Sequence, residues 1–139
     1  CCIAWGALYD FGPIFESAAN KVLAAPSVTD VVSHGMWVTG QNTPEDALKV
    51  AKKMTLKGIV QKITCPILIA HGENDRQVPV SDAERTYEEA INSPQRKLKI
   101  FTLEEGGAEH CQVDNRQLIG DVMSDWAAEI FGLDPAGIN

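Results

Sequence analysis

The chain contains, at its centre, the nearly continuous apolar run Ile63-Thr64-Cys65-Pro66-Ile67-Leu68-Ile69-Ala70-His71-Gly72. Such a run, bounded by proline and glycine, is typical of a parallel strand that is buried on both faces of a sheet. The polar loop Glu73–Pro79 follows, and Ser81-Asp82-Ala83-Glu84 then has the pattern of a capping box that opens a helix through Ala90. This strand, loop and helix predict an α/β fold.

A second strand and helix are predicted toward the C-terminus. Lys97–Leu103 alternates charged and apolar side chains, as an outer strand does. Asn115–Phe131 is predicted to be a helix that ends at Gly132, because its apolar residues recur on one helical face. Those residues are Leu118, Ile119, Val122, Met123, Trp126 and Ile130. Residues 133–139 carry Asp134-Pro135 and Gly137, and we expect a loose tail there.

Toward the N-terminus, the apolar run Cys1–Ala7 predicts a strand buried on both faces, and helices are expected to follow it. Helical spacing predicts one helix over 11–25 that ends at Pro26-Ser27, and a short one over 28–38. Thr43 as N-cap and Pro44 at the first position predict a helix through Met54, with a further helical piece over 56–60. We therefore predict a single domain with parallel strands, flanking helices and a helical insertion over 10–62, in which 63–132 carries the other two strands.

Composition excludes several classes of protein. The 139 residues are 45% hydrophobic and 22% charged, which is ordinary for a soluble globular protein. A net charge of −7 and scattered basic residues argue against nucleic acid as a partner, and no apolar stretch is long enough to span a membrane. The start Cys1-Cys2 has neither Met nor a signal-peptide pattern, so we expect a chain cut within a domain. The four cysteines form no CxxC pair, so we expect free thiols and a cytoplasmic location, with a disulfide as the alternative.

The loops after the two C-terminal strands carry the residues of chemical interest. Open parallel sheets react at the carboxyl ends of their strands, where Asp75 follows one strand and His110 follows the next. A separation of 110 − 75 = 35 positions, with one helix between, fits the acid and the base of a nucleophile, acid, base order. In that chemistry the histidine takes the proton of the nucleophile and the carboxylate orients the histidine. The alternatives are that Asp75 is a turn residue and His110 a structural loop histidine.

A family resemblance supports the catalytic interpretation. The loop over 72–79 resembles the acid turn of α/β-hydrolases, and Gly106-Gly107-Ala108-Glu109-His110 is more specific. With Ala4-Trp5-Gly6-Ala7 and Trp37-Val38-Thr39-Gly40, it resembles the fungal polyketide-shortening hydrolases of pigment pathways and dihydroxypseudooxynicotine hydrolase-like enzymes. The resemblance implies the C-terminal portion of an α/β-hydrolase fold with a helical cap. It also implies a serine triad without cofactor that cleaves a C–C bond beside a carbonyl in a small molecule.

The chain departs from this pattern at the nucleophile. It has no Gly-x-Ser-x-Gly elbow, and none of its serines is flanked by glycines in that way. Those serines are Ser17, Ser27, Ser33, Ser81, Ser93 and Ser124. We therefore expect the serine in a missing N-terminal half, and we expect this chain alone to be inactive. The strand edge left open predicts pairing with that half or with a second copy of the chain.

Other residues carry weaker predictions. Asp10 and Glu16 are candidates for presenting a carboxylate to a polar substrate, as the resemblance suggests, and His34 and Trp37 are candidates for lining the pocket, although core packing is the default for them. We expect His71 to be a satisfied core histidine, Arg76 to brace the acid loop through a salt bridge, and Cys111 not to face His110. Neither a metal site nor a phosphate-binding loop is predicted.

Three other functions remain open at this stage. A carboxylesterase or a peptidase of the same fold would use the same triad, because the triad does not reveal its substrate. A fragment without enzymatic activity could instead keep the fold and act by binding another chain. The missing nucleophile is the argument for that last function.

Overall fold

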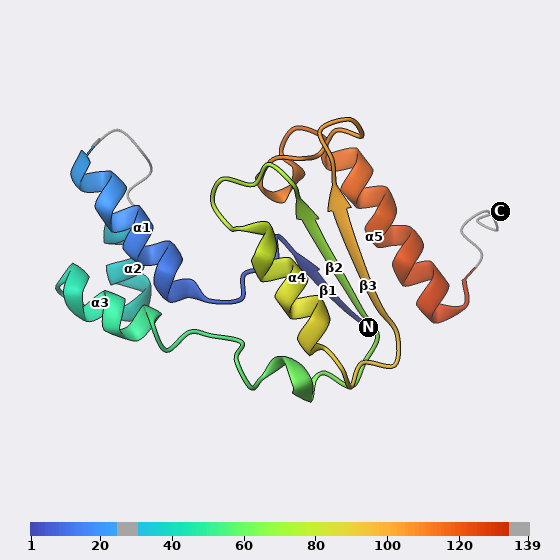
Figure 1. The fold of residues 1–139 in the computed structure, drawn as a ribbon, viewed down its shortest axis with the longest axis horizontal. Coiled ribbons are helices and arrows are strands. Elements are labelled where there is room, and N and C mark those ends of the chain that lie inside the picture. Colours follow the sequence, from blue (N-terminus) through green and yellow to red (C-terminus); the bar gives the residue numbers. More distant parts are fainter. Residues whose placement is uncertain (25–30, 134–139) are drawn as a thin grey trace. The chain divides into compact units, whose positions relative to one another are not determined.

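The computed structural model describes residues 1–24 and 31–133, and for 21–24 and 31 it describes the backbone only. The chain divides into two compact units (Figure 1). Residues 1–8 and 58–139 form the first, which we call the sheet unit, and 9–57 form the second, which we call the helical unit. The expected break at Pro26-Ser27 and all but the first residue of the expected tail lie outside the described residues.

The sheet unit contains three parallel strands in the order β1-β2-β3. They are β1 (Cys2–Trp5), β2 (Ile67–Gly72) and β3 (Arg96–Phe101). All six residues of β2 are buried, which confirms the predicted central strand. The expectation that the first strand is buried on both faces is wrong. Cys2, Ile3 and Ala4 are only partly buried, and Trp5 is 42% exposed. Within the described residues β1 also has a neighbouring strand along one edge only.

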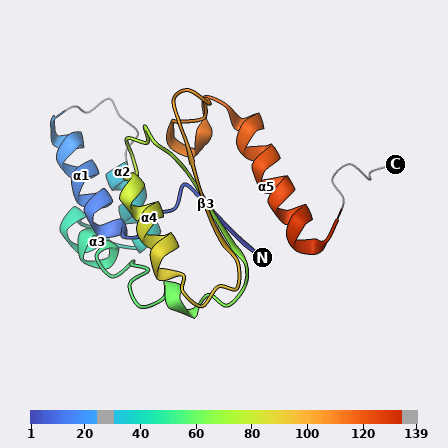
Figure 2. The ribbon, with the colours of Figure 1, turned by 45° about the vertical axis from the view of Figure 1, so that its right-hand side comes forward.

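Two helices, α4 (Val80–Glu89) and α5 (Arg116–Phe131), cover opposite faces of this sheet (Figure 2). The core beneath α5 is formed by Ala70, Phe101 and Ile119. The predicted ends of α5 are confirmed, because the Asn115 side chain accepts a hydrogen bond from the Leu118 N–H and Gly132 ends the helix with a left-handed backbone.

The predicted capping box of α4 is wrong. The helix begins at Val80, with Pro79 as its N-cap residue, so that Ser81 already lies inside the first turn. The Pro79 carbonyl accepts a hydrogen bond from the Asp82 N–H at 3.0 Å. The extended backbone of the proline therefore sets the start of the helix, and no side-chain cap is used.

The helical unit consists of α1 (Phe11–Ala24), α2 (Val31–Thr39) and α3 (Pro44–Ala51). These helices pack around buried Phe15, Ala47 and Ala51. The predicted start of α3 is confirmed: Thr43 Oγ1 accepts a hydrogen bond from the Asp46 N–H at 3.2 Å, and Pro44 occupies the first helical position.

The chain enters and leaves the helical unit through two paired segments. Asp10 and Thr55 form an isolated antiparallel bridge, the Leu56 N–H donates to the Tyr9 carbonyl, and the Phe11 N–H donates to the Met54 carbonyl. The expected helix over 56–60 is therefore wrong, because the backbone at Leu56 hydrogen-bonds to Tyr9. A 3₁₀ turn, η1 (Val60–Lys62), follows instead.

The expected helical insertion over 10–62 is longer than the helical unit. Residues 58–62 belong to the sheet unit, where Gln61 hydrogen-bonds Glu89 at the end of α4 and its carbonyl accepts from the Asn92 side chain. All four cysteines are free thiols, and no described helix is long and apolar enough to cross a membrane.

Candidate active site

The loops that follow β2 and β3 are packed backbone against backbone at the carboxyl end of the sheet. The Asn74 N–H donates to the Ala108 carbonyl at 3.0 Å, and the Glu73 N–H donates to the Phe101 carbonyl at 2.9 Å. A Cβ atom at Gly72 would overlap the backbone of Ala108, so only glycine permits this approach. The two loops therefore hold a fixed relation to each other.

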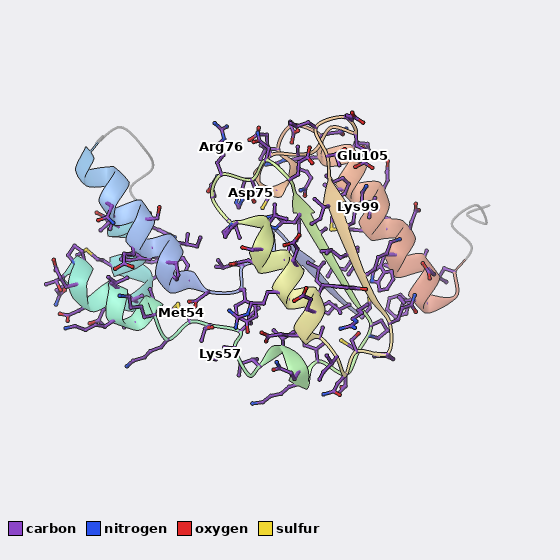
Figure 3. The ribbon with its side chains drawn as sticks, viewed as in Figure 1. Met54, Lys57, Asp75, Arg76, Lys99 and Glu105 are labelled. Carbon is purple, nitrogen blue, oxygen red and sulfur yellow. The ribbon has the colours of Figure 1, made fainter. Side chains whose placement is uncertain are left out.

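This packing brings Asp75 and His110 together. His110 Nδ1 lies 2.8 Å from Asp75 Oδ2, which is the distance of a charge-assisted hydrogen bond. The Asp75 side chain is fully buried, whereas the His110 side chain is 31% exposed. The other oxygen, Asp75 Oδ1, accepts hydrogen bonds from the N–H groups of Gln77 (2.8 Å) and Val78 (2.9 Å). Figure 3 shows Asp75 and its exposed neighbour Arg76 in the loop beyond β2.

These donors control the ionisation of the acid. Burial by itself raises the pKa of Asp75, but the hydrogen bonds from the Val78 and Gln77 N–H groups and from His110 outweigh it, so that the pKa lies below its usual value. Asp75 is therefore a carboxylate at neutral pH. A buried carboxylate on Nδ1 fixes the tautomer of an imidazole and leaves Nε2 as its proton acceptor.

Comparisons with known proteins identify the fold. No family model matches the chain. An alignment over 104 residues, which covers 72% of the chain, is 31% identical to 20-hydroxy-prefusarin hydrolase FUS2 of Gibberella moniliformis. A solved structure with ferulic acid bound, Est1E of Butyrivibrio proteoclasticus, matches 63% of the chain with a TM-score of 0.51 and 22% identity, and it has the α/β-hydrolase fold. The chain shares the α/β-hydrolase fold. It spans about a quarter of the length of FUS2 and about a third of Est1E.

An acidic side chain that sequence reasoning missed supports the histidine loop. The carboxylate of Asp114 accepts hydrogen bonds from three consecutive N–H groups, those of Gly107 (2.9 Å), Ala108 (3.0 Å) and Glu109 (3.2 Å). Gly107 has a φ of 80°, which glycine adopts without strain. The position of Asp114, seven residues after Gly107, carries no motif that would have revealed this contact.

Glu109 joins the two loops through its side chain. Its carboxylate accepts a hydrogen bond from Asn74 Nδ2 at 2.6 Å and lies 3.3 Å from Nη2 of Arg76. The expected salt bridge of Arg76 is therefore present, and its partner belongs to the histidine loop. Because the Arg76 side chain is 81% exposed, the Asn74 contact carries more of the coupling between the loops.

Cys111 faces the histidine, contrary to the sequence-based expectation. Its Sγ atom lies 3.5 Å from His110 Nε2. Cys111 and Gln112 have φ angles of 48° and 47°, and this left-handed turn brings neighbouring side chains to the same side in a way that no spacing rule predicts. The thiol also lies against Gly6, where a Cβ atom would be only 2.8 Å from Sγ. Burial, followed by the charge of Asp75, raises the pKa of the Cys111 thiol.

The four predicted substrate-binding residues all lie in the helical unit. Glu16 contacts Lys52 at 3.4 Å, and Asp10 Oδ1 accepts a hydrogen bond from the Gly12 N–H at the start of α1. His34 and Trp37 stack with their ring centroids 5.8 Å apart, and Trp37 is 78% exposed, so it is not a core residue of this unit.

The helical unit also contains a hollow of about 320 Å³ between its three helices. Of the predicted substrate-binding residues, Glu16 lines this hollow, beside Phe15 and Leu48. Among the described residues, no three His, Cys, Asp or Glu side chains lie close enough together to hold a metal ion.

Proposed function

We propose that this chain is the C-terminal part of a serine-triad hydrolase, in which His110 is the general base and Asp75 is the residue that orients it. One observation carries the proposal: the 2.8 Å contact between His110 Nδ1 and the buried Asp75 carboxylate. With Nδ1 occupied in this way, Nε2 is the nitrogen that accepts the proton of a nucleophile and returns it to the leaving group.

The nucleophile is a serine outside these 139 residues. The segment that carries it pairs with the open edge of β1, where Trp5 is partly exposed and backbone groups on one side have no strand within the described residues. No cofactor enters the chemistry, because a serine triad forms and hydrolyses its covalent intermediate with protein groups and water alone.

The substrate that we propose is a small aromatic or polyketide-like molecule that is cleaved at a C–C or ester bond beside a carbonyl. The name of FUS2, a hydrolase of 20-hydroxy-prefusarin, and the ferulic acid bound to Est1E support this class. Glu16, Asp10, His34 and Trp37 are the side chains that we propose to contact it. Of these, the exposed and stacked Trp37 has the surface that an aromatic ring requires.

The decisive variant is His110→Ala in the longest natural protein that contains this chain. We expect kcat for an activated aromatic ester to fall by about four to six orders of magnitude, because loss of the base removes the triad as a unit. Val113→Ala is the matched control, since Val113 lies in the same loop with an exposed side chain. A fluorophosphonate should label a serine of that protein. Retained activity in His110→Ala would overturn the proposal.

A thiol hydrolase is the second candidate, because Cys111 Sγ lies 3.5 Å from Nε2 of the same histidine. We favour serine because the raised pKa of Cys111 keeps the thiol protonated at neutral pH, and the thiolate is the reactive form. A non-catalytic role in binding another chain becomes the better explanation if neither the serine probe nor an ester substrate reacts.

A further inference from the structure

His71, at the carboxyl end of β2, is fully buried and lies beside the acid of the pair. Its Nε2 atom is 3.0 Å from the Val78 carbonyl oxygen and 3.4 Å from Asp75 Oδ2. Its other nitrogen, Nδ1, is buried and has no hydrogen-bond partner among the described residues. Core packing alone does not explain an imidazole with one nitrogen aimed at two oxygen atoms beside a catalytic candidate.

The neighbours of Nε2 determine where the proton of this imidazole resides. A carbonyl oxygen and a carboxylate oxygen can only accept hydrogen bonds, so Nε2 must carry a hydrogen atom. A second proton on Nδ1 would bury an N–H group without an acceptor, which is unfavourable. The geometry thus assigns His71 the Nε2–H tautomer.

This proton begins a continuous series of hydrogen bonds. His71 Nε2–H donates to the Val78 carbonyl, the Val78 N–H donates to Asp75 Oδ1, and Asp75 Oδ2 accepts from His110 Nδ1. Val78 is therefore held through both of its backbone polar groups. The series ties the loop that carries the acid back to β2, the central strand, all of whose residues are buried.

We propose that His71 is a positioning residue that acts through Val78 and Asp75. In its fixed tautomer it holds the acid loop so that the Asp75 carboxylate meets His110 Nδ1. Its effect on reaction rate rests on the proposed hydrolase function, whereas its effect on the hydrogen bond between Asp75 and His110 does not.

Two substitutions separate positioning from packing. His71→Leu introduces an apolar side chain of similar size and removes the donor, whereas His71→Gln restores an N–H donor near the position of Nε2. Thr86→Val is the matched control for the loss of a buried hydrogen bond, because Thr86 is buried on α4 and its hydroxyl donates to the Asp82 carbonyl, away from Asp75.

The first readout is NMR on the 139-residue chain labelled with ¹⁵N in histidine. The wild-type His71 should show a protonated Nε2 and a bare Nδ1. The downfield proton of His110 Nδ1 should weaken or disappear in His71→Leu, persist in Thr86→Val and return in His71→Gln. A protonated Nδ1 in wild-type His71 would overturn the proposal, and so would an unchanged His110 signal in a folded His71→Leu variant. If that variant does not fold, the tautomer of wild-type His71 alone decides whether the proposal holds.

The second readout is steady-state kinetics on the longest natural protein that contains the chain. His71→Leu should lower kcat about 10- to 100-fold with little change in KM, and His71→Gln should recover most of the loss. Wild-type activity in His71→Leu would count against positioning. If no variant and no wild-type protein hydrolyses an ester, the proposed function fails, and the NMR result alone decides the role of His71.

Discussion

Asp75 shows how a single buried carboxylate can make folding depend on pH. Its folded-state pKa lies below the usual value of about 4, because the N–H groups of Val78 and Gln77 and the His110 ring outweigh the effect of burial. A lowered folded-state pKa means that the stabilisation is fully present above the unfolded-state pKa. It is lost as the pH falls through the folded-state pKa.

We therefore expect Asp75→Asn to reduce the free energy of unfolding more at pH 7 than at pH 3. Urea titrations of wild type and variant at both pH values measure this difference. Asp125→Asn, which removes an exposed carboxylate on α5, controls for the change in net charge. A deficit that is the same at both pH values would show that Asp75 contributes nothing through its ionisation.

Cys111 tests which atom is the nucleophile. The thiol contacts His110 Nε2, but its raised pKa keeps it protonated at neutral pH. In the longest natural protein that contains the chain, we expect Cys111→Ala to retain kcat/KM within about a few-fold, since the proposed nucleophile is a serine elsewhere. Ester hydrolysis and fluorophosphonate labelling of this variant provide the measurement. A loss of several orders of magnitude, with no labelled serine, would instead identify a thiol hydrolase.

At the scale of elements, the histidine loop depends on Asp114. Three consecutive N–H groups, at 107–109, donate to this one carboxylate. Asp114→Ala removes their acceptor, and we expect the loop to open more easily by about 1–2 kcal/mol, with amide exchange at 107–109 faster by about 10-fold. Hydrogen exchange followed by NMR measures this. Asp121→Ala, on the exposed face of α5, should leave these amides unchanged, and equal exchange in Asp114→Ala and wild type would contradict the assignment.

The elements that the sequence predicted correctly are those whose signals are local. The predicted caps at Thr43 and Gly132 lie within one helical turn of the groups that they satisfy, and β2 is recognisable from its apolar run because every one of its residues is buried. The start of α4 and the segment over 56–60 were predicted wrongly. At these places a proline backbone and a hydrogen bond to Tyr9, 47 residues earlier (56 − 9), decide the conformation.

The candidate site likewise has a part that the sequence predicted and a part that it did not. The order and spacing of Asp75 and His110 indicated that they meet, because parallel strands end at the same edge of a sheet. Their supports were not predictable. Asp114, Glu109 and the ring of His71 act through contacts that depend on loop conformation, and Cys111 faces His110 only because its backbone is left-handed.

At the scale of the whole molecule, the two units have separate cores. Ala70, Phe101 and Ile119 of the sheet-unit core, and the hydrogen bonds that link His71, Asp75 and His110, lie outside 9–57. The chain enters and leaves the helical unit through two segments that pair with each other, and the Phe11 N–H there donates to the Met54 carbonyl. Phe11 and Met54 are therefore already paired, so a two-residue hairpin turn can join them in place of residues 12–53.

We expect replacement of residues 12–53 by Asn-Gly to leave the sheet unit folded, with the downfield His110 Nδ1 proton still visible by NMR. The same replacement in the longest natural protein should preserve hydrolysis of a minimal ester but raise KM for a bulky aromatic ester, because Glu16, His34 and Trp37 are removed. The control is Trp37→Ala, which should raise KM for the bulky ester alone. Unfolding of the shortened chain would show that the sheet unit needs the helical unit for its stability. An unchanged KM for the bulky ester would place substrate recognition in the sheet unit instead.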